Sequence, residues 1–134
     1  MSADFESFFD RRTKAAHAYV NGDAAPLQTL LTPNETASFH SPGGDSVTGP
    51  KPVADRYVED AKRFAPGSRS QLEILQKAAG DLAFWTGFQN ASMCLAGKDE
   101  PVDMRIRVTE VFRREAGEWK MVHRHADMAG KGAK

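Results

Sequence analysis

The sequence predicts an α+β domain in which three N-terminal helices pack on a curved antiparallel sheet. Apolar residues recur every three or four positions in the first half of the chain, and from Arg69 onward they alternate every second position. The last third contains two facing strands, Met104 to Arg114 and Trp119 to Ala126, joined by a tight turn at 115–118. Helices followed by a run of antiparallel strands indicate a sheet with its helices on one face.

The helices are predicted at three places. The first carries a stripe of residues three and four positions apart and ends near Asn21-Gly22; the stripe consists of Phe5, Phe8, Phe9, Arg12, Ala16, Tyr19 and Val20. A short second helix begins at Pro26, and a third follows Gly49-Pro50. Between the second and third helices, 36–41 favours a strand and 41–45 favours a turn.

The strands follow the third helix. Leu72 and Ile74 alternate with polar neighbours, and 79–81 forms a turn signal. The next strand, 81–95, has Trp85 and Gln89 on one face, while Phe84 and Phe88 lie on the other. Gly87 allows this strand to bend. Large apolar groups occur on both faces, so we expect the face without helices to form a homodimer interface.

Size and charge exclude several classes of function. The 134 residues suit one domain, which we expect at 1–129 with a disordered tail at 130–134. The 18 basic and 18 acidic residues cancel, which argues against a nucleic-acid partner. The apolar runs are too short to span a membrane, and a single cysteine, Cys94, agrees with a cytoplasmic location.

The strand that begins at Met104 has charged residues on both of its faces. Its alternating faces carry Arg105, Arg107 and Thr109 on one side, and Ile106, Val108, Glu110 and Phe112 on the other. One of these faces must carry buried charge, because an unpaired buried charge costs several kcal/mol and needs a partner or a ligand. The sequence therefore predicts a polar pocket.

Three features together resemble the nuclear transport factor 2-like superfamily. They are the Asn21-Gly22-Asp23 end of the first helix, the Ser41-Pro42-Gly43-Gly44 loop leading to Gly49, and the hairpin with Trp119-Lys120-Met121-Val122-His123-Arg124-His125. Within the superfamily the chain is similar to SnoaL-like and ketosteroid-isomerase-like small proteins, and to the association domain of calcium/calmodulin-dependent protein kinase. The resemblance implies a cone-shaped fold around an apolar pocket, and pairing of two copies through the sheet.

The resemblance does not carry over the isomerase chemistry. In ketosteroid isomerases a carboxylate just before the loop proline abstracts a proton, but Ser41 stands at that position here. The tyrosine expected on the first helix falls near Ala15, and only the strand acid has a counterpart, at Glu110. With two of three roles missing, we do not expect steroid isomerisation by that mechanism.

The kinase association domain suggests a site for small acids. Arginines on its corresponding strands line a cavity, and here Gln89 and Thr109 stand where two of them are expected. If Arg107 and Arg124 share a face, their guanidinium groups would hold a carboxylate. The candidate ligand-binding residues are Tyr57, Trp85, Gln89, Arg107, Thr109 and Arg124. In the alternative reading, Arg105 and Arg113 are solvated edge charges and Arg107 pairs with Glu110 or Glu73.

The histidines give weaker candidates. His123 and His125 project from one face of a strand, but no third ligand has suitable spacing in the sequence, so no metal site is expected. His40 precedes the Ser41-Pro42 turn, where an imidazole could serve as acid or base near Tyr57 or Tyr19. No phosphate-binding glycine pattern or hydrolase motif occurs, and we expect no cofactor.

Three functions are compatible with this sequence. The first is a dimeric binding protein for a small, partly apolar acid or carbonyl compound. The second is a cofactor-independent, metal-free isomerase, dehydratase or cyclase that transfers a proton through His40 or a pocket water. The third is an association module without catalysis. If the strand faces are reversed, the interior holds Glu110, His123 and His125 in place of Arg107, Thr109 and Arg124, and the preferred ligand becomes a cation or a metal.

Overall fold

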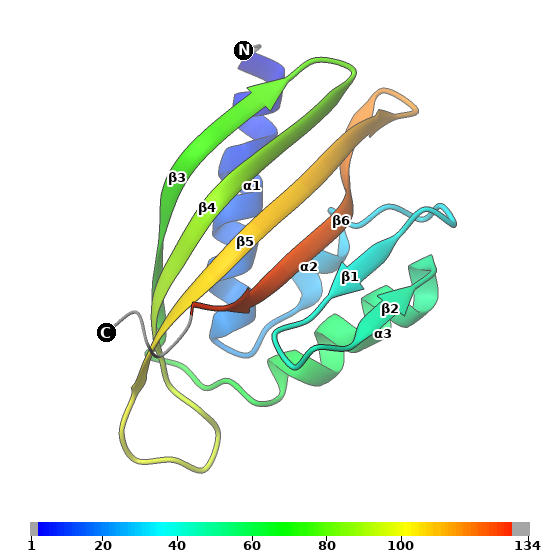
Figure 1. Cartoon of the computed structure of the whole chain (residues 1–134). Helices are drawn as coiled ribbons and strands as arrows, with labels where there is room; N and C mark the ends of the chain where they lie inside the picture. Colours follow the sequence, from blue (N-terminus) through cyan, green and yellow to red (C-terminus); the bar gives the residue numbers. More distant parts are fainter. Residues whose placement is uncertain (1–2, 130–134) are drawn as a thin grey trace.

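The computed structural model describes residues 3–129, so the tail predicted at 130–134 lies outside the described residues. Helix α1 (Ala3–Val20) is followed by the short α2 (Ala25–Gln28) and, after two short strands, by α3 (Pro50–Ala61). Figure 1 shows α1 running behind the sheet, across β3, β4 and β5. The three predicted helices are therefore confirmed, and they lie on one side of the sheet.

Six strands form one twisted sheet. They are β1 (Ser38–His40), β2 (Ser46–Thr48), β3 (Arg69–Ala79), β4 (Leu82–Met93), β5 (Val102–Glu115) and β6 (Glu118–Met128). Their order across the sheet is β2-β1-β6-β5-β4-β3. All neighbouring pairs are antiparallel except β1 and β6, which are parallel. The sheet is thus mixed rather than purely antiparallel, and the turn-rich segment after His40 contributes the unpredicted strand β2.

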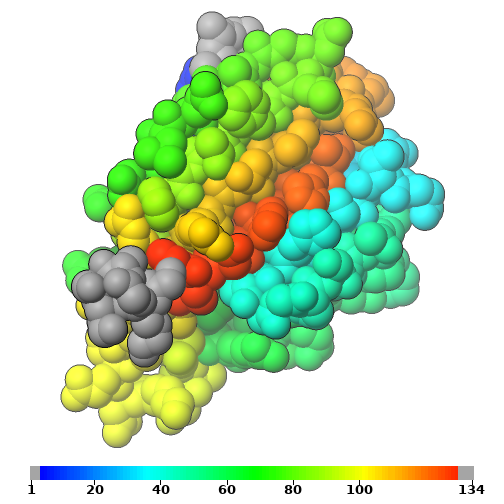
Figure 2. Space-filling model, viewed as in Figure 1, coloured from blue at the N-terminus to red at the C-terminus, as the bar shows by residue number. Residues whose placement is uncertain are grey.

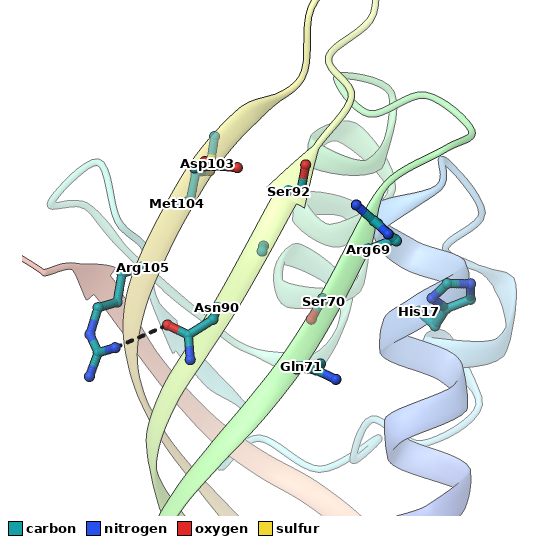
Figure 3. A pocket seen from close by; sticks show the side chains of 10 residues that line it. His17, Arg69, Ser70, Gln71, Asn90, Ser92, Asp103, Met104 and Arg105 are labelled. Atoms are coloured by element: carbon teal, nitrogen blue, oxygen red, sulfur yellow. Dashed lines mark hydrogen bonds between the residues drawn. The ribbon is translucent and has the colours of Figure 1, made fainter.

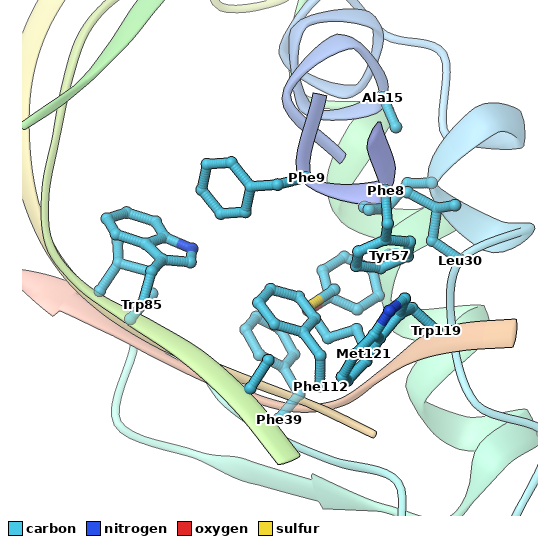
Figure 4. Packing of buried hydrophobic residues seen from close by; sticks show 14 of the residues in the cluster. Phe8, Phe9, Ala15, Leu30, Phe39, Tyr57, Trp85, Phe112, Trp119 and Met121 are labelled. Atoms are coloured by element: carbon cyan, nitrogen blue, oxygen red, sulfur yellow. The ribbon is translucent and has the colours of Figure 1, made fainter. Parts of the chain in front are cut away.

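The inner face of the sheet and the apolar side of α1 enclose an aromatic core. Phe5 packs edge-on against Trp119 with ring centroids 5.1 Å apart, and Phe8 does the same against Phe112 at 5.3 Å. Trp85 closes the other side of this cluster opposite Phe9 (Figure 4). These rings explain why α1 is amphipathic: its phenylalanine stripe faces the sheet.

Gly87 lies where the backbone of β3 approaches β4 closely. Leu75 forms a bulge in β3, because the pairing with β4 skips from Ile74 to Gln76. The bulged backbone folds over Gly87, where a Cβ atom would lie 2.1 Å from the carbonyl oxygen of Glu73. Only glycine fits this close approach of the two strands.

A second bulge decides which side chains of β6 face the interior. Phe112 pairs with Met121 but Val111 pairs with His123, so Val122 is an extra residue on β6. Without it, counting from the hairpin turn would place Arg124 opposite Thr109. With it, Arg124 lies opposite Glu110.

The bulge corrects the predicted faces. Arg124 faces the interior as expected, but Arg107 and Thr109 lie on the outer face of the sheet, with the Arg107 side chain 62% exposed. The alternative with exchanged strand faces holds for Glu110, which is buried. It does not hold for His123 and His125, which lie on the outer face. The outer face appears in Figure 2.

Candidate functional site

Three side chains from adjacent strands meet inside the cone. Trp85 on β4 pairs in register with Glu110 on β5, and Glu110 pairs with Arg124 on β6. The indole Nε1 of Trp85 donates to Glu110 Oε1 at 2.7 Å, and Nη1 of Arg124 donates to Glu110 Oε2. Arg124 Nη2 also donates to Oε1 of Gln89 at 3.3 Å.

Helix α1 adds a second guanidinium group. Arg12 donates from Nε to Glu110 Oε1 at 2.7 Å and from Nη2 to Oε2 at 3.1 Å, which is a bidentate geometry. Arg12 is 2% exposed and Glu110 1% exposed. We call Arg12, Trp85, Gln89, Glu110 and Arg124 the buried polar cluster.

The cluster carries more positive than negative charge. Two guanidinium groups share the one carboxylate of Glu110. Burial alone would raise the pKa of Glu110, but the charges of Arg12 and Arg124 and their hydrogen bonds lower this pKa to about 2. Glu110 is therefore ionised at neutral pH, and the cluster retains a net positive charge.

A small cavity lies beside the cluster. Its volume is about 30 Å³, and the residues around it are Arg12, Ala16, Tyr19, Leu27, Tyr57, Gln89, Glu110, Met121 and Arg124. Space of this size accommodates one or two water molecules. Burial raises the pKa of both Tyr57 and Tyr19, so their hydroxyl groups stay protonated.

The structure brings together four of the six predicted ligand-binding residues. Tyr57, Gln89 and Arg124 line the cavity, and Trp85 lies behind it through Glu110. Arg107 and Thr109 lie on the opposite side of the sheet, where Arg107 donates from Nε to Asp127 at 2.6 Å. Thr109 exchanges a hydrogen bond with Thr86 at 2.8 Å.

His40 is also on the outer face, away from the cavity. Its Nδ1 shares a 2.8 Å hydrogen bond with Ser46 rather than contacting Tyr57 or Tyr19. The ring lies 4.9 Å from that of His123 and 5.2 Å from that of His125, centroid to centroid. Within residues 3–129, no group of three or more His, Cys, Asp or Glu is arranged to hold a metal ion.

Sequence reasoning missed the pairing of Arg12 with Glu110. The signal was present in the pattern, because Arg12 falls within the apolar stripe of α1 and Glu110 alternates with Ile106, Val108 and Phe112. A charged residue on an otherwise apolar face predicts a buried partner of opposite charge. Here each of the two supplies that partner for the other.

A bent sheet with helices on one side and a polar cluster within its apolar interior defines the class of cone-shaped NTF2-like folds. The chain belongs to the SnoaL-like domain family, whose family model matches residues 10–129. No curated protein matches it. No helix in residues 3–129 is long and apolar enough to cross a membrane.

Several solved structures share the fold. An NTF2-like superfamily protein from Salmonella enterica serovar Typhimurium has a TM-score of 0.78 at 15% identity, covering 94% of this chain and 91% of that one. A provisionally named dehydratase of the NTF2-like family from Streptomyces avermitilis has a TM-score of 0.73 at 23% identity, covering 93% and 95%. The CaMKII hub from S. rosetta has a TM-score of 0.71 at 20% identity, covering 96% and 98%. These likenesses establish the fold and leave the function to be argued from the site.

Proposed function

We propose that this SnoaL-like protein binds a small, partly apolar organic acid or carbonyl compound in its cone, beside Arg124. The observation that carries the proposal is the excess of guanidinium groups, because among residues 3–129 Arg12 and Arg124 pair with one carboxylate, that of Glu110. A buried positive charge next to a cavity favours an anion or a polarised carbonyl oxygen.

The cavity walls suit such a ligand. Arg124 is bound to Gln89 by a long hydrogen bond of 3.3 Å, which a ligand carboxylate could replace at small cost. Leu27 and Met121 supply apolar contacts on the same wall. Within the described residues neither Tyr19 nor Tyr57 uses its hydroxyl in a hydrogen bond, so each could donate to a ligand oxygen.

The size of the cavity limits the ligand. About 30 Å³ is well below the roughly 300 Å³ of a drug-sized site, so the ligand is either a few heavy atoms or enters by displacing a wall. Tyr19 is the candidate for that movement, because it is only partly buried and contacts Tyr57 and Phe64 through ring edges.

Binding is supported over acid–base catalysis. The carboxyl of Glu110 has its pKa lowered to about 2, and the two tyrosines have theirs raised by burial. A general acid or base works best with a pKa near the ambient pH. His40, the residue expected to do this work, is on the far side of the sheet. The isomerase, dehydratase or cyclase alternative therefore has weaker support.

Titration with acetate, propionate and benzoate, alongside the neutral propionamide, tests the proposal. In a Trp119→Phe background, the fluorescence of Trp85 reports ligand binding beside Glu110, and calorimetry gives the affinity. Arg124→Gln should weaken the tightest acid by at least about tenfold, since a hydrogen bond to a charged group is lost. Arg124→Lys, which keeps the charge, serves if the first variant folds poorly.

Arg107→Ala is the matched control, because Arg107 lies on the adjacent strand but faces solvent. It should leave the affinity unchanged. Acids that bind equally to wild type and to both Arg124 variants, or no binding at all, would overturn the proposal. Equal affinity for propionate and propionamide would identify the carbonyl group, rather than the charge, as the recognised feature.

We also propose that two copies associate through the outer face of the sheet. Phe84 and Phe88 are only partly buried there, and Leu82 is 54% exposed at the end of the same strand. Such apolar surface on a monomer favours a partner. Sedimentation analysis of the wild type should give a dimer and Phe88→Glu a monomer; a monomeric wild type would reject this association.

A further inference from the structure

The edge strand β3 and helix α1 flank an open groove separate from the cavity beside the buried polar cluster, and Arg12 and Ala16 of α1 line both. This groove has a volume of about 720 Å³ and lies between Phe9, Thr13 and His17 of α1 and Ser70, Leu72 and Ile74 of β3. A second open groove, of about 820 Å³, wraps around the start of β3 and shares His17, Ser70 and Gln71 with the first. Figure 3 shows these three residues where the two grooves meet.

Both ends of the groove beside α1 are fixed by contacts between the helix and the strand. At one end, the Asn21 side chain accepts from the Ser68 N–H at 3.0 Å and donates to the Ser68 carbonyl at 3.2 Å. At the other end, Lys77 pairs with Glu6 at 3.1 Å and lies 4.4 Å from the centre of the Phe9 ring. The stretch between these contacts stays open.

The backbone of that stretch is free to pair with another strand. β3 is at the edge of the sheet, so its N–H and C=O groups that point away from β4 have no strand beside them. Within the described residues, no backbone hydrogen bond reaches this edge between Arg69 and Ile74. The bulge at Leu75 ends the regular segment, which leaves six residues, or about 20 Å, for pairing.

The chemistry of the walls differs on the two sides of β3. Towards α1 the apolar lining consists of Phe9, Ala16, Leu72 and Ile74, with Arg12 and Thr13 beside them. Towards the outer face it is basic, with Arg69 and Arg105, and Asp103 is the carboxylate of that groove. Lys14, which pairs with Asp10 at 3.1 Å, and His17 lie on the helix rim. Arg105 already pairs with Glu73, whereas Arg69 has no ion-pair partner within the described residues.

We infer that residues 69–74 of β3 accept an extended acidic peptide, which adds a strand to the sheet in the groove beside α1. Side chains of an added strand alternate between the two faces. Its apolar residues would enter the groove against Leu72 and Ile74. Its acidic residues would lie on the outer face, with Arg69 at one end and Glu73, which already pairs with Arg105, at the other. The partner is therefore a segment in which apolar and acidic residues alternate over about six positions.

Fluorescence anisotropy with a labelled Glu-Val-Glu-Val-Glu-Val peptide tests this inference. The probe should bind at least about tenfold more tightly than Glu-Glu-Glu-Val-Val-Val, which has the same composition without the alternation. Methylating alternate backbone nitrogens of the probe should remove binding, because they are the donors to the strand edge. Amide hydrogen exchange should slow at 69–74 when the probe binds.

Two pairs of variants locate the site. Arg69→Glu should weaken the alternating peptide by about fivefold, since it reverses one exposed charge contact, whereas Lys51→Glu on α3 should not. Ile74→Ser should weaken it by about tenfold through lost apolar contact, whereas Leu75→Ser should not, because Leu75 lies at the bulge and lines a groove on the outer face.

Three results would overturn the inference: equal binding of the two peptides, wild-type affinity in both Arg69→Glu and Ile74→Ser, or unchanged amide exchange at 69–74. Slower exchange at 69–74 that depends on protein concentration without any peptide would instead assign this edge to a second copy of the chain.

Discussion

Strands β5 and β6 carry two cross-strand arginine–carboxylate ion pairs on opposite sides of the sheet. Glu110 pairs with Arg124 on the inner face, and Arg107 pairs with Asp127 on the outer face, three positions along each strand. The inner side chains are 2% and 14% exposed, and the outer ones 62% and 34%. The two ion pairs therefore contribute differently to stability, because only the inner pair is shielded from water.

The difference extends to the neighbours of each pair. Glu110 receives further hydrogen bonds from Arg12 and Trp85, so both oxygens of its carboxylate have partners. Within the described residues, the ion-pair contacts of Asp127 are with Arg107 and with the ring of His125, whose Nε2 lies 3.4 Å from Oδ2. A buried carboxylate needs such a set of donors, whereas an exposed one is hydrated.

The largest predicted effect is that of Glu110→Gln. This variant leaves Arg12 and Arg124 buried with no negative charge, so the free energy of unfolding should fall by about 3 to 5 kcal/mol. Urea denaturation followed by circular dichroism measures the change. The matched variant Asp127→Asn should show no measurable loss, because its pair is exposed. Equal losses in the two variants would contradict the distinction between the pairs.

The same carboxylate should make stability depend on pH in acid. Its pKa in the fold is about 2, against an ordinary value of 4.5, so the folded protein holds this carboxyl ionised more strongly than the unfolded chain does. The resulting stability is present above pH 4.5 and is lost as the pH falls towards 2, by about 3 kcal/mol. Denaturation curves between pH 6 and pH 2 measure it. Asp127→Asn should keep this loss and Glu110→Gln should lack it; a persistent loss in Glu110→Gln would assign it to other groups.

Much of the fold could be predicted from periodicity, because the predicted elements have long regular patterns. The periodic stripe of α1, from Phe5 to Val20, and the alternation along β4 each extend over more than ten residues. β2 was missed because it has only three residues and follows a turn-rich segment. The parallel pairing of β1 with β6 joins segments more than 80 positions apart, and no local pattern reports such a contact.

The site was harder to predict because one extra residue in β6 exchanges the inward and outward faces for the side chains that follow it. The bulge at Val122 moves Arg124 from opposite Thr109 to opposite Glu110, and neither residue type nor spacing in the sequence marks it. Arg107 was therefore assigned to the interior in error. Trp85 and Gln89 were placed correctly, since they precede the bulge and lie on one regular strand.

A smaller difference in the free energy of unfolding is expected between substitutions on the two faces of β4. Gly87→Ala would place a methyl group 2.1 Å from the carbonyl oxygen of Glu73, so the backbone of β3 must move, at a cost of about 1 to 3 kcal/mol. Thr86→Ala, one residue earlier and on the outer face, removes a hydroxyl that bonds Thr109 and should cost less than about 1 kcal/mol. Urea denaturation compares them, and the reverse order would show that β3 can shift without strain.

The smallest effect concerns the three imidazoles of the outer face. Burial lowers the pKa of His123, and the positive charges that His40 and His125 acquire lower it further. On β5 His123 pairs in register with Val111, and Nδ1 of His123 shares a 2.7 Å hydrogen bond with Ser38 of β1. His123 in the folded state therefore binds a proton less readily than His123 in the unfolded chain does.

The sign of the effect follows from that difference. The stability that neutral His123 supports is present above pH 6.5, its ordinary pKa, and decreases as the pH falls below that value. Proton NMR should show His123 titrating below 6.5, and His40→Gln should raise its pKa by removing one neighbouring charge. Titration of His123 above 6.5, or no response to His40→Gln, would show that solvent screens this face so well that its charges act independently. In that case the contrast between the two faces would be complete, with coupling of charges confined to the buried polar cluster.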